Sequence, residues 1–305
     1  MAAVELGALR YMTKPADPEE LLQAMGEAVK LHRIARLKQQ ALALLGAEEK
    51  RISDRAGLEA TFAKGLARLW MAYQPIVRWS TREIFAYEAL LRTDEPAIPH
   101  PGIFLDIAER LGRVHDIGRA VRRAVARDLR QAPQGVNLFV NLHPDDLADP
   151  ELTSGSAPLL EASARVVLEI TERASLDGIV DLKERVARLK AQGYRTAIDD
   201  LGAGYAGLTS LAHLQPEVVK IDMSLVHGID EDPRKRTLVR SLIEACSELG
   251  MMVVVEGIET AAQRDVVVEA GADLLQGFLF ARPGRPFTSV SWGDAGAGGD
   301  AGATQ

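Results

Sequence analysis

The segment Arg195-Thr-Ala-Ile-Asp-Asp-Leu-Gly-Ala-Gly-Tyr205 decides how the sequence is interpreted, because a short apolar run ends there in two adjacent carboxylates. The run predicts a buried strand, and Gly202 and Gly204 predict the loop after it. If Asp199 ends the strand and Asp200 begins the loop, the two side chains can converge. Two converging acids are costly without a cation between them, so they indicate a divalent-metal site. The alternative is that Asp200 caps the next segment and Asp199 is a solvated strand end.

Outward from this segment, short apolar runs alternate with amphipathic stretches. The apolar runs are Ala72–Val77, Ile84–Leu91, Val136–Leu142, Val166–Ile170, Thr196–Ile198, Val218–Ile221, Met252–Val255 and Leu274–Phe280. The amphipathic stretches include Phe104–Leu111, Ile117–Leu129, Leu182–Ala191, Arg236–Leu249 and Ala261–Ala270. This alternation predicts an α/β fold, a TIM-like (β/α)8 barrel. Only Arg78–Glu83 separates the first two runs, too short for a helical crossover, so one strand should be antiparallel.

The flanking residues predict the borders of the barrel. Asp17 and Pro18 suit a helix start, and that N-terminal helix should run to about Leu45. We expect residues 1–45 to form this helical segment, residues 46–64 a linker with a short helix, and residues 65–287 the barrel. Residues 288–305 should form a disordered tail, since they are rich in Gly, Ala and Asp from Gly293 onward.

The composition limits the partners and the compartment. The formal net charge of -7 disfavours a polymeric nucleic acid, although a small anionic substrate is compatible if metal ions neutralise it locally. The single cysteine, Cys246, excludes an intramolecular disulfide and fits a reducing compartment. The start shows no signal peptide, and the longest apolar run, Met251–Val255, is too short to span a bilayer. We therefore expect a cytoplasmic protein without a membrane segment.

Polar residues recur at the ends of nearly all predicted strands, where barrel enzymes carry their chemistry. They are Glu88, Asn141, Glu169, Asp199, Asp200, Lys220, Glu256 and Gln276. Any one of them is compatible with a solvated strand end, but their recurrence at equivalent positions indicates a site, because charges inside a barrel must be paired or metal-bound. Carboxylate and amide oxygens suit Mg²⁺ or Mn²⁺, and Asp199 with Asp200 could bridge two ions about 4 Å apart. Lys220 could orient a water or help to deprotonate it.

Eight short motifs in order give the chain a resemblance to a known family. They are Tyr73-Gln-Pro-Ile, Glu88-Ala-Leu-Leu-Arg, Val140-Asn-Leu, Leu168-Glu-Ile-Thr-Glu, Ile198-Asp-Asp, Lys220-Ile-Asp, Val255-Glu-Gly-Ile-Glu and Gln276-Gly-Phe. Over about residues 65–287 the chain resembles the EAL family of cyclic-di-GMP phosphodiesterases. The resemblance implies metal-dependent hydrolysis of cyclic-di-GMP to linear pGpG.

The same resemblance implies a role for each matching residue. Glu88, Asn141, Glu169 and Asp199 would ligate one Mg²⁺ or Mn²⁺, and Asp199 and Asp200 a second. Lys220 would contact the nucleophilic water, with Glu256 and Gln276 near the second ion's water shell, so Glu88, Lys220, Glu256 and Asp200 are the predicted catalytic residues. Gln74, Arg92 and Gln276 would bind the substrate, and Glu172 would anchor the Asp-Asp loop. That loop departs from the commoner family form at Leu201, Ala203, Ala206 and Gly207, which removes hydroxyl partners for Glu172.

The chain start resembles the last strand and helix of a response-regulator receiver domain. Gly7-Ala8, Tyr11 and Lys14-Pro15 carry this resemblance, which covers about the first 35 residues. The segment would then be a receiver remnant that serves as a linker helix or dimer contact. The alternative is a surface helix that packs on its own domain.

Two further functions and one assembly remain open at the level of sequence. The domain would be a cyclic-di-GMP receptor if it binds without cleaving, or an enzyme for another phosphodiester. We also expect a homodimer, coupled through the Asp-Asp loop and the apolar residues Leu208, Leu211 and Leu214, unless this stretch only covers the barrel.

Overall fold

The computed structural model describes residues 48–171, 181–202, 211, 214–285 and 287–292. The chain divides into two units, Met1–Glu59 and Ala60–Gln305, and the second unit contains every described strand. Several predictions fall outside the described residues: the receiver-like segment, the anchoring role of Glu172, Leu208 with most of its loop, and the tail from Gly293.

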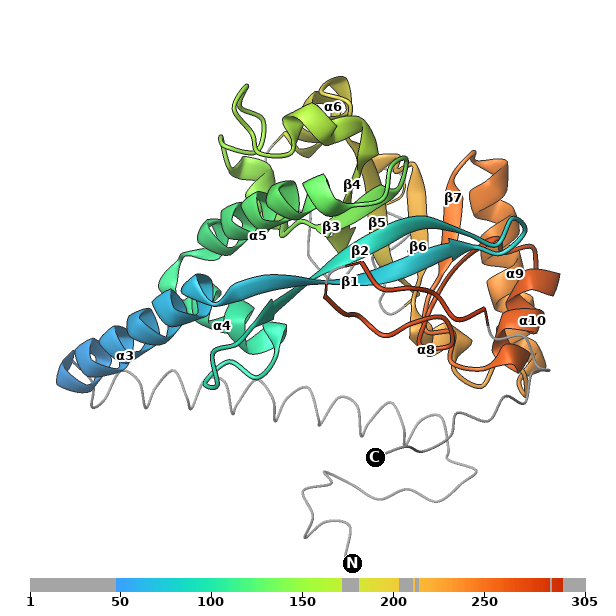
Figure 1. Cartoon of the computed structure of the whole chain (residues 1–305), viewed down its shortest axis with the longest axis horizontal. Helices are drawn as coiled ribbons and strands as arrows, with labels where there is room; N and C mark the ends of the chain where they lie inside the picture. Colours follow the sequence, from blue (N-terminus) through green and yellow to red (C-terminus); the bar gives the residue numbers. More distant parts are fainter. Residues whose placement is uncertain (1–47, 172–180, 203–210, 212–213, 286, 293–305) are drawn as a thin grey trace, which may run out of the picture. The chain divides into compact units, whose positions relative to one another are not determined.

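Eight strands close into a barrel in sequence order (Figure 1). They are β1 Leu69–Arg78, β2 Glu83–Thr93, β3 Asn137–Asn141, β4 Val166–Thr171, β5 Arg195–Leu201, β6 Val218–Ile221, β7 Met252–Val255 and β8 Leu274–Gln276. Strand β1 pairs antiparallel with both β2 and β8, and all other neighbouring pairs are parallel. The TIM-like barrel with one reversed strand is therefore confirmed.

Helices follow most strands. They are α3 Glu48–Ala67, α4 Pro101–Leu111, α5 Val114–Asp128, α6 Leu182–Ala191, α8 Met223–Val226, α9 Pro233–Glu248 and α10 Ala261–Glu269, with 3-10 turns at Leu129–Gln131, Pro144–Ala148 and Leu160–Arg165. Local sequence explains several starts: Asp232 caps α9 ahead of Pro233, and Thr260 with Gln263 forms a capping box on α10. Helix α3 spans 20 residues and is longer than the short helix expected in its segment. Among the described residues, no helix is long and apolar enough to cross a membrane.

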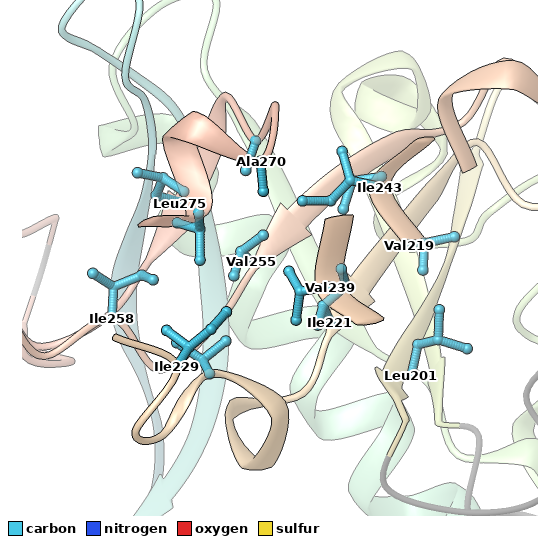
Figure 2. Close-up of a cluster of buried hydrophobic side chains, with 14 of the residues drawn as sticks. Leu201, Val219, Ile221, Ile229, Val239, Ile243, Val255, Ile258, Ala270 and Leu275 are labelled. Carbon is cyan, nitrogen blue, oxygen red and sulfur yellow. The ribbon is translucent and has the colours of Figure 1, made fainter. Parts of the chain in front are cut away.

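Two clusters of the apolar core lie among the described residues and position the strands. Figure 2 shows the part outside the barrel, where residues such as Ile221 and Val255 on the strands meet Val239 and Ile243 on α9. The other part fills one level inside the barrel and consists of Ile76, Ala86, Phe139, Val167, Ala197, Val218, Val254 and Leu274. Because side chains alternate along a strand, the residue two positions further on points into the barrel as well.

This register places a polar level directly above the inner apolar level. Two residues after the apolar members come Glu88, Asn141, Glu169, Asp199, Lys220, Glu256 and Gln276. On β1 the polar residue, Gln74, instead lies two residues before Ile76, because that strand runs in the opposite direction. The strand pairing thus gathers residues from all eight strands at one level of the barrel.

The segment after β8 turns back along β1, and we call residues 281–285 and 287–292 the C-terminal strap (Figure 1). Main-chain hydrogen bonds join Tyr73 and Gly284 in both directions, at 2.8 and 3.2 Å. The ring of Phe287 packs against Tyr73 and Tyr87, with centroids 4.5 and 5.1 Å apart. The strap is therefore fixed to the outer side of the β1–β2 pair.

Candidate active site

Lys220 lies at the centre of the polar level and is 1% exposed. Its Nζ lies 2.6 Å from Glu256 Oε1, 2.7 Å from Glu169 Oε1, 3.1 Å from Asp199 Oδ1 and 3.3 Å from Glu88 Oε2. Burial by itself would lower the pKa of Lys220, but the charges of these four carboxylates outweigh it and raise the pKa well above its usual range. The side chain is therefore held as an ammonium ion. We call these five residues together with Asp200 the Lys220 cluster.

The Lys220 cluster has more negative than positive charge. Four carboxylates face one ammonium group, and Glu169 is fully buried, with no hydrogen-bond partner for its Oε2 among the described residues. Burial raises the pKa of Glu169 well above its usual range and that of Glu256 to about 8. Lys220 opposes both shifts, whereas neighbouring carboxylates add to them. An excess of buried acid with an unused oxygen fits a site that is completed by cations.

Asp199 and Asp200 converge through a local irregularity of β5. The strand continues to Leu201, but its register against β6 shifts between Ile198 and Leu201, and Asp200 has a φ of 61°. This left-handed conformation interrupts the alternation of side chains, as in a β-bulge. One oxygen each of Asp199, Asp200 and Glu256 lies within 4.8 Å of the others. The predicted convergence is present, although a bulge inside the strand produces it and not the strand end.

Three amide side chains border the Lys220 cluster. Asn141 Nδ2 donates to Glu88 Oε1 at 3.2 Å, and Gln276 Nε2 donates to Glu88 Oε2 at 2.6 Å. Gln276 Nε2 also lies 3.2 Å from Gln74 Oε1, and Gln74 Nε2 donates to the main-chain O of Ala281 at 3.1 Å. Because Asn141 donates through nitrogen, its amide oxygen remains as the atom suited to a metal.

A cavity of about 240 Å³ opens above the Lys220 cluster. Its lining includes the expected Gln74, Glu88, Asp200, Glu256 and Gln276. It also includes Asp222, Met223, Glu259 and Phe278, which the sequence analysis did not select. Asp222 and Phe278 stand inside motifs that had been recognised, Lys220-Ile-Asp and Gln276-Gly-Phe, so position in a motif was the available signal. Glu259 likewise ends the recognised motif Val255-Glu-Gly-Ile-Glu, whereas Met223, the first residue of α8, lies outside every recognised motif.

Arg92 lies further along β2, on the same strand face as Glu88, and does not line this cavity. It borders a neighbouring, mainly apolar cavity of about 300 Å³ that also reaches Asn141. Burial lowers the pKa of Arg92, and the charge of Glu88 counteracts the shift. The structure therefore places Arg92 outside the cavity above the Lys220 cluster and beside a second cavity, which it shares with Asn141.

This geometry combines the parts that phosphoryl or acyl hydrolysis requires. Hard oxygen ligands suited to divalent cations line one side of an open cavity, and a buried ammonium group lies beside them. Amide groups fix the orientation of Glu88.

Comparison with known proteins gives a consistent result. A family model described as EAL domain matches residues 58–283. The cyclic di-GMP phosphodiesterase RocR of Pseudomonas aeruginosa is 32% identical over 224 residues, which cover 69% of this chain and 56% of that protein. The probable cyclic di-GMP phosphodiesterase PdeG of Escherichia coli is 28% identical over 221 residues, or 69% of this chain and 44% of that protein. The chain spans 31% to 56% of the length of the first three curated relatives.

Solved structures agree with this match. The PaMucR phosphodiesterase in complex with c-di-GMP is 30% identical, with a TM-score of 0.65, and the match covers 74% of this chain and 97% of that one. A manganese/cy-diGMP complex of Klebsiella pneumoniae BlrP1 is 29% identical, with a TM-score of 0.62, and covers 71% of this chain and 56% of that one. A calcium/cy-diGMP complex of BlrP1 is 31% identical, with a TM-score of 0.64 and the same coverage of both chains.

Proposed function

The chain belongs to the EAL domain family, and from that premise we propose that it is a divalent-metal-dependent phosphodiesterase that opens cyclic di-GMP to linear pGpG. The observation that carries the proposal is the Lys220 cluster itself, in which acids on β2, β4 and β5 and directly after β7 surround one buried ammonium group at the mouth of the barrel. Relatives named as cyclic di-GMP phosphodiesterases and neighbours solved with that ligand support the choice of substrate.

The metal ligands in this proposal are the acids and the amide that the sequence singled out. Glu88, Asn141, Glu169 and Asp199 would hold one Mg²⁺ or Mn²⁺, and Asp199 with Asp200 a second. When bound, such ions lower the pKa of a coordinated water and neutralise the phosphate. The closeness of the Asp199, Asp200 and Glu256 oxygens supports a place for the second ion.

Lys220 and Glu256 would act on the attacking water. Lys220 lies among the acids that would hold the ions, and its Nζ would orient the water as a hydrogen-bond donor. Glu256 touches Lys220 and faces the cavity, which makes it the carboxylate placed to accept the proton that the water loses.

The substrate would lie across the cavity and towards Arg92. Gln276 and Gln74 line the cavity, and Arg92 borders the neighbouring cavity further along β2, from where its guanidinium would pair with a phosphate. Glu172 would steady the Asp-Asp loop. The reaction would proceed in the cytoplasm, which the single cysteine favours.

The proposal includes a homodimer. Leu214 is buried, and Leu211 packs against the core cluster of its own barrel. These contacts favour the alternative in which this stretch covers the barrel. Sedimentation of the purified chain across a range of concentrations tests the assembly directly.

The runner-up is a receptor that binds cyclic di-GMP without cleaving it. The presence of all the predicted acids favours the enzyme. The test is incubation of the chain with cyclic di-GMP and Mn²⁺, followed by chromatography for pGpG. We expect conversion over many turnovers. Saturable binding without conversion would support the receptor instead, and neither binding nor conversion would reject both.

A further inference from the structure

The two glutamines beside the Lys220 cluster form a directed chain of hydrogen bonds. It begins at the main-chain O of Ala281 in the C-terminal strap, which accepts from Gln74 Nε2 at 3.1 Å. Gln74 Oε1 accepts from Gln276 Nε2 at 3.2 Å, and Gln276 Nε2 also donates to Glu88 Oε2 at 2.6 Å. We call these three side chains and the Ala281 carbonyl the amide relay.

The direction of the amide relay is fixed by chemistry. A carbonyl oxygen can only accept, so Ala281 turns the NH2 group of Gln74 towards itself and leaves the oxygen of Gln74 facing Gln276. Gln276 must then present its NH2 group, whose two hydrogens serve Gln74 and Glu88. Its oxygen, Oε1, is buried and has no hydrogen-bond partner among the described residues, and Gln276 lines the cavity.

Burial makes this arrangement hard for water to replace. Gln74 is 8% exposed, Gln276 3% and Glu88 5%. Glu88 accepts from Asn141 on one oxygen and meets Gln276 and Lys220 with the other. Loss of the Gln276 donor would therefore leave the buried Oε1 of Gln74 unpaired and Glu88 Oε2 with Lys220 alone, and loss of the Gln74 donor would leave the Ala281 carbonyl without that bond.

The strap end of the amide relay is held by the main chain. Ala281 N donates to the O of Gly277 at 3.2 Å, and Gly284 pairs with Tyr73, the residue next to Gln74. Phe287 packs on Tyr73 and Tyr87 from outside the cavity. The Ala281 carbonyl thus occupies a position set by contacts that do not involve the cavity.

We infer that Gln74 is a positioning residue, which acts through Gln276 to orient Glu88 for a metal ion and which the C-terminal strap holds in place. Both polar ends of Gln74 are hydrogen-bonded within the protein, so besides lining the cavity Gln74 acts on Glu88 through Gln276. The expected changes in kcat and KM rest on the proposed function. The expected change in Mn²⁺ affinity does not.

The test measures Mn²⁺ affinity in the absence of nucleotide, together with kcat and KM for cyclic di-GMP. Gln74→Met keeps the length of the side chain but has neither donor nor carbonyl, and Gln74→Glu cannot donate to Ala281. We expect each to weaken Mn²⁺ binding by about tenfold, the lower end of the usual effect for residues behind a metal ligand, and to lower kcat. KM should change by less than about threefold. Arg92→Ala is the matched control for substrate contact, with raised KM and parental Mn²⁺ affinity.

A second arm tests the connection to the strap. Phe287→Ala should weaken Mn²⁺ binding in the parent by several-fold and have little further effect in the Gln74→Met background, because both changes act through one network. Circular dichroism and melting profiles establish that each variant is folded. Parental Mn²⁺ affinity with raised KM in folded Gln74→Met would overturn the inference in favour of direct substrate contact. If Gln74→Met kept the parental Mn²⁺ affinity, kcat and KM, Gln74 would have no role in positioning Glu88 or in binding substrate. A parent that binds Mn²⁺ but does not cleave cyclic di-GMP would reject the proposed function alone.

Discussion

At the scale of single residues, Lys220 contacts four carboxylates, more than any other cation in the described part of the chain. Its replacement by alanine should lower turnover at least about 10²-fold, the loss typical for removal of one preorganised catalytic group. We expect the variant to fold with Mn²⁺ present, because cations can balance the four carboxylates that face Lys220. Rates of pGpG formation and circular dichroism check this, and parental turnover would contradict the assigned role.

Glu88 can be tested against an acid on the same strand. Glu88→Ala removes a predicted metal ligand and should lower turnover at least about 10²-fold, with weaker Mn²⁺ binding. Glu83 begins β2 and is exposed, so Glu83→Ala is the matched control and should retain parental turnover. Equal rates for the two variants would remove Glu88 from the site.

Asp149 makes the free energy of unfolding depend on pH, and this residue does not belong to the Lys220 cluster. Burial alone would raise the pKa of Asp149, but hydrogen bonds and charge from Arg119 and Arg122 lower it to about 2. A carboxyl with a depressed folded pKa stabilises above its unfolded pKa of about 3.9 and loses that contribution as the pH falls towards 2. Asp149→Asn should thus cost about 2 kcal/mol at pH 7 and flatten the loss of stability between about pH 4 and pH 2. Urea unfolding at several pH values measures both effects. If Asp149→Asn lost stability between about pH 4 and pH 2 as steeply as the parent, Asp149 would not be the source of this pH dependence.

Much of the site could be predicted from the sequence, because its polar residues recur at the ends of the apolar runs. Glu88, Glu169 and Lys220 stand out as charges inside apolar runs, which a buried strand tolerates only with partners. The amide relay could not be predicted, because its direction depends on the Ala281 carbonyl, more than 200 positions from Gln74 in sequence. Met223 was missed for a similar reason, since only the closure of the barrel brings it to the cavity.

At the scale of elements, strand pairing was easier to predict than strand ends. Strands β6 and β7 have the predicted bounds, whereas β8 ends at Gln276 and not at Phe280. The early end arises where Gly277 approaches the main chain of Ile258 and Phe280 N bonds back to Gly277 O. Apolar periodicity does not register such a turn, because the residues on both sides of it are apolar.

The close approach at Gly277 yields a test of how β8 is held. A methyl group there would overlap main-chain atoms of Ile258, so Gly277→Ala should cost about 1–3 kcal/mol, the range for overpacking, and displace Gln276. Gly155 has open space around it and is the matched control, for which Gly155→Ala should be nearly neutral. Melting temperature and turnover are the measurements. A neutral Gly277→Ala would show that the loop between β7 and α10, which carries Ile258, yields without disturbing the site.

At the scale of the whole molecule, metal ions should stabilise the fold as well as support the reaction. A ligand that binds only the folded state at a hundred times its dissociation constant adds about 2.7 kcal/mol. We therefore expect EDTA to abolish hydrolysis and lower the melting temperature, and Mn²⁺ or Mg²⁺ to restore both. Full activity after verified removal of metal would reject metal dependence. Restored melting without restored activity would separate binding from chemistry.

Because strand β1 is reversed, the chain enters the barrel on one face and the strap leaves it towards the other. Leu69 begins β1 opposite Thr93, at the carboxyl end of β2, so the chain enters on the face that carries the Lys220 cluster. The strap leaves towards the other face, where the O of Trp292 accepts from Arg82 in the β1–β2 turn. In an all-parallel barrel the entry would be on the face away from the chemistry. A dye coupled to a cysteine at position 68 would therefore sense nucleotide arriving and leaving, while the same dye at position 292 would serve as the silent reference.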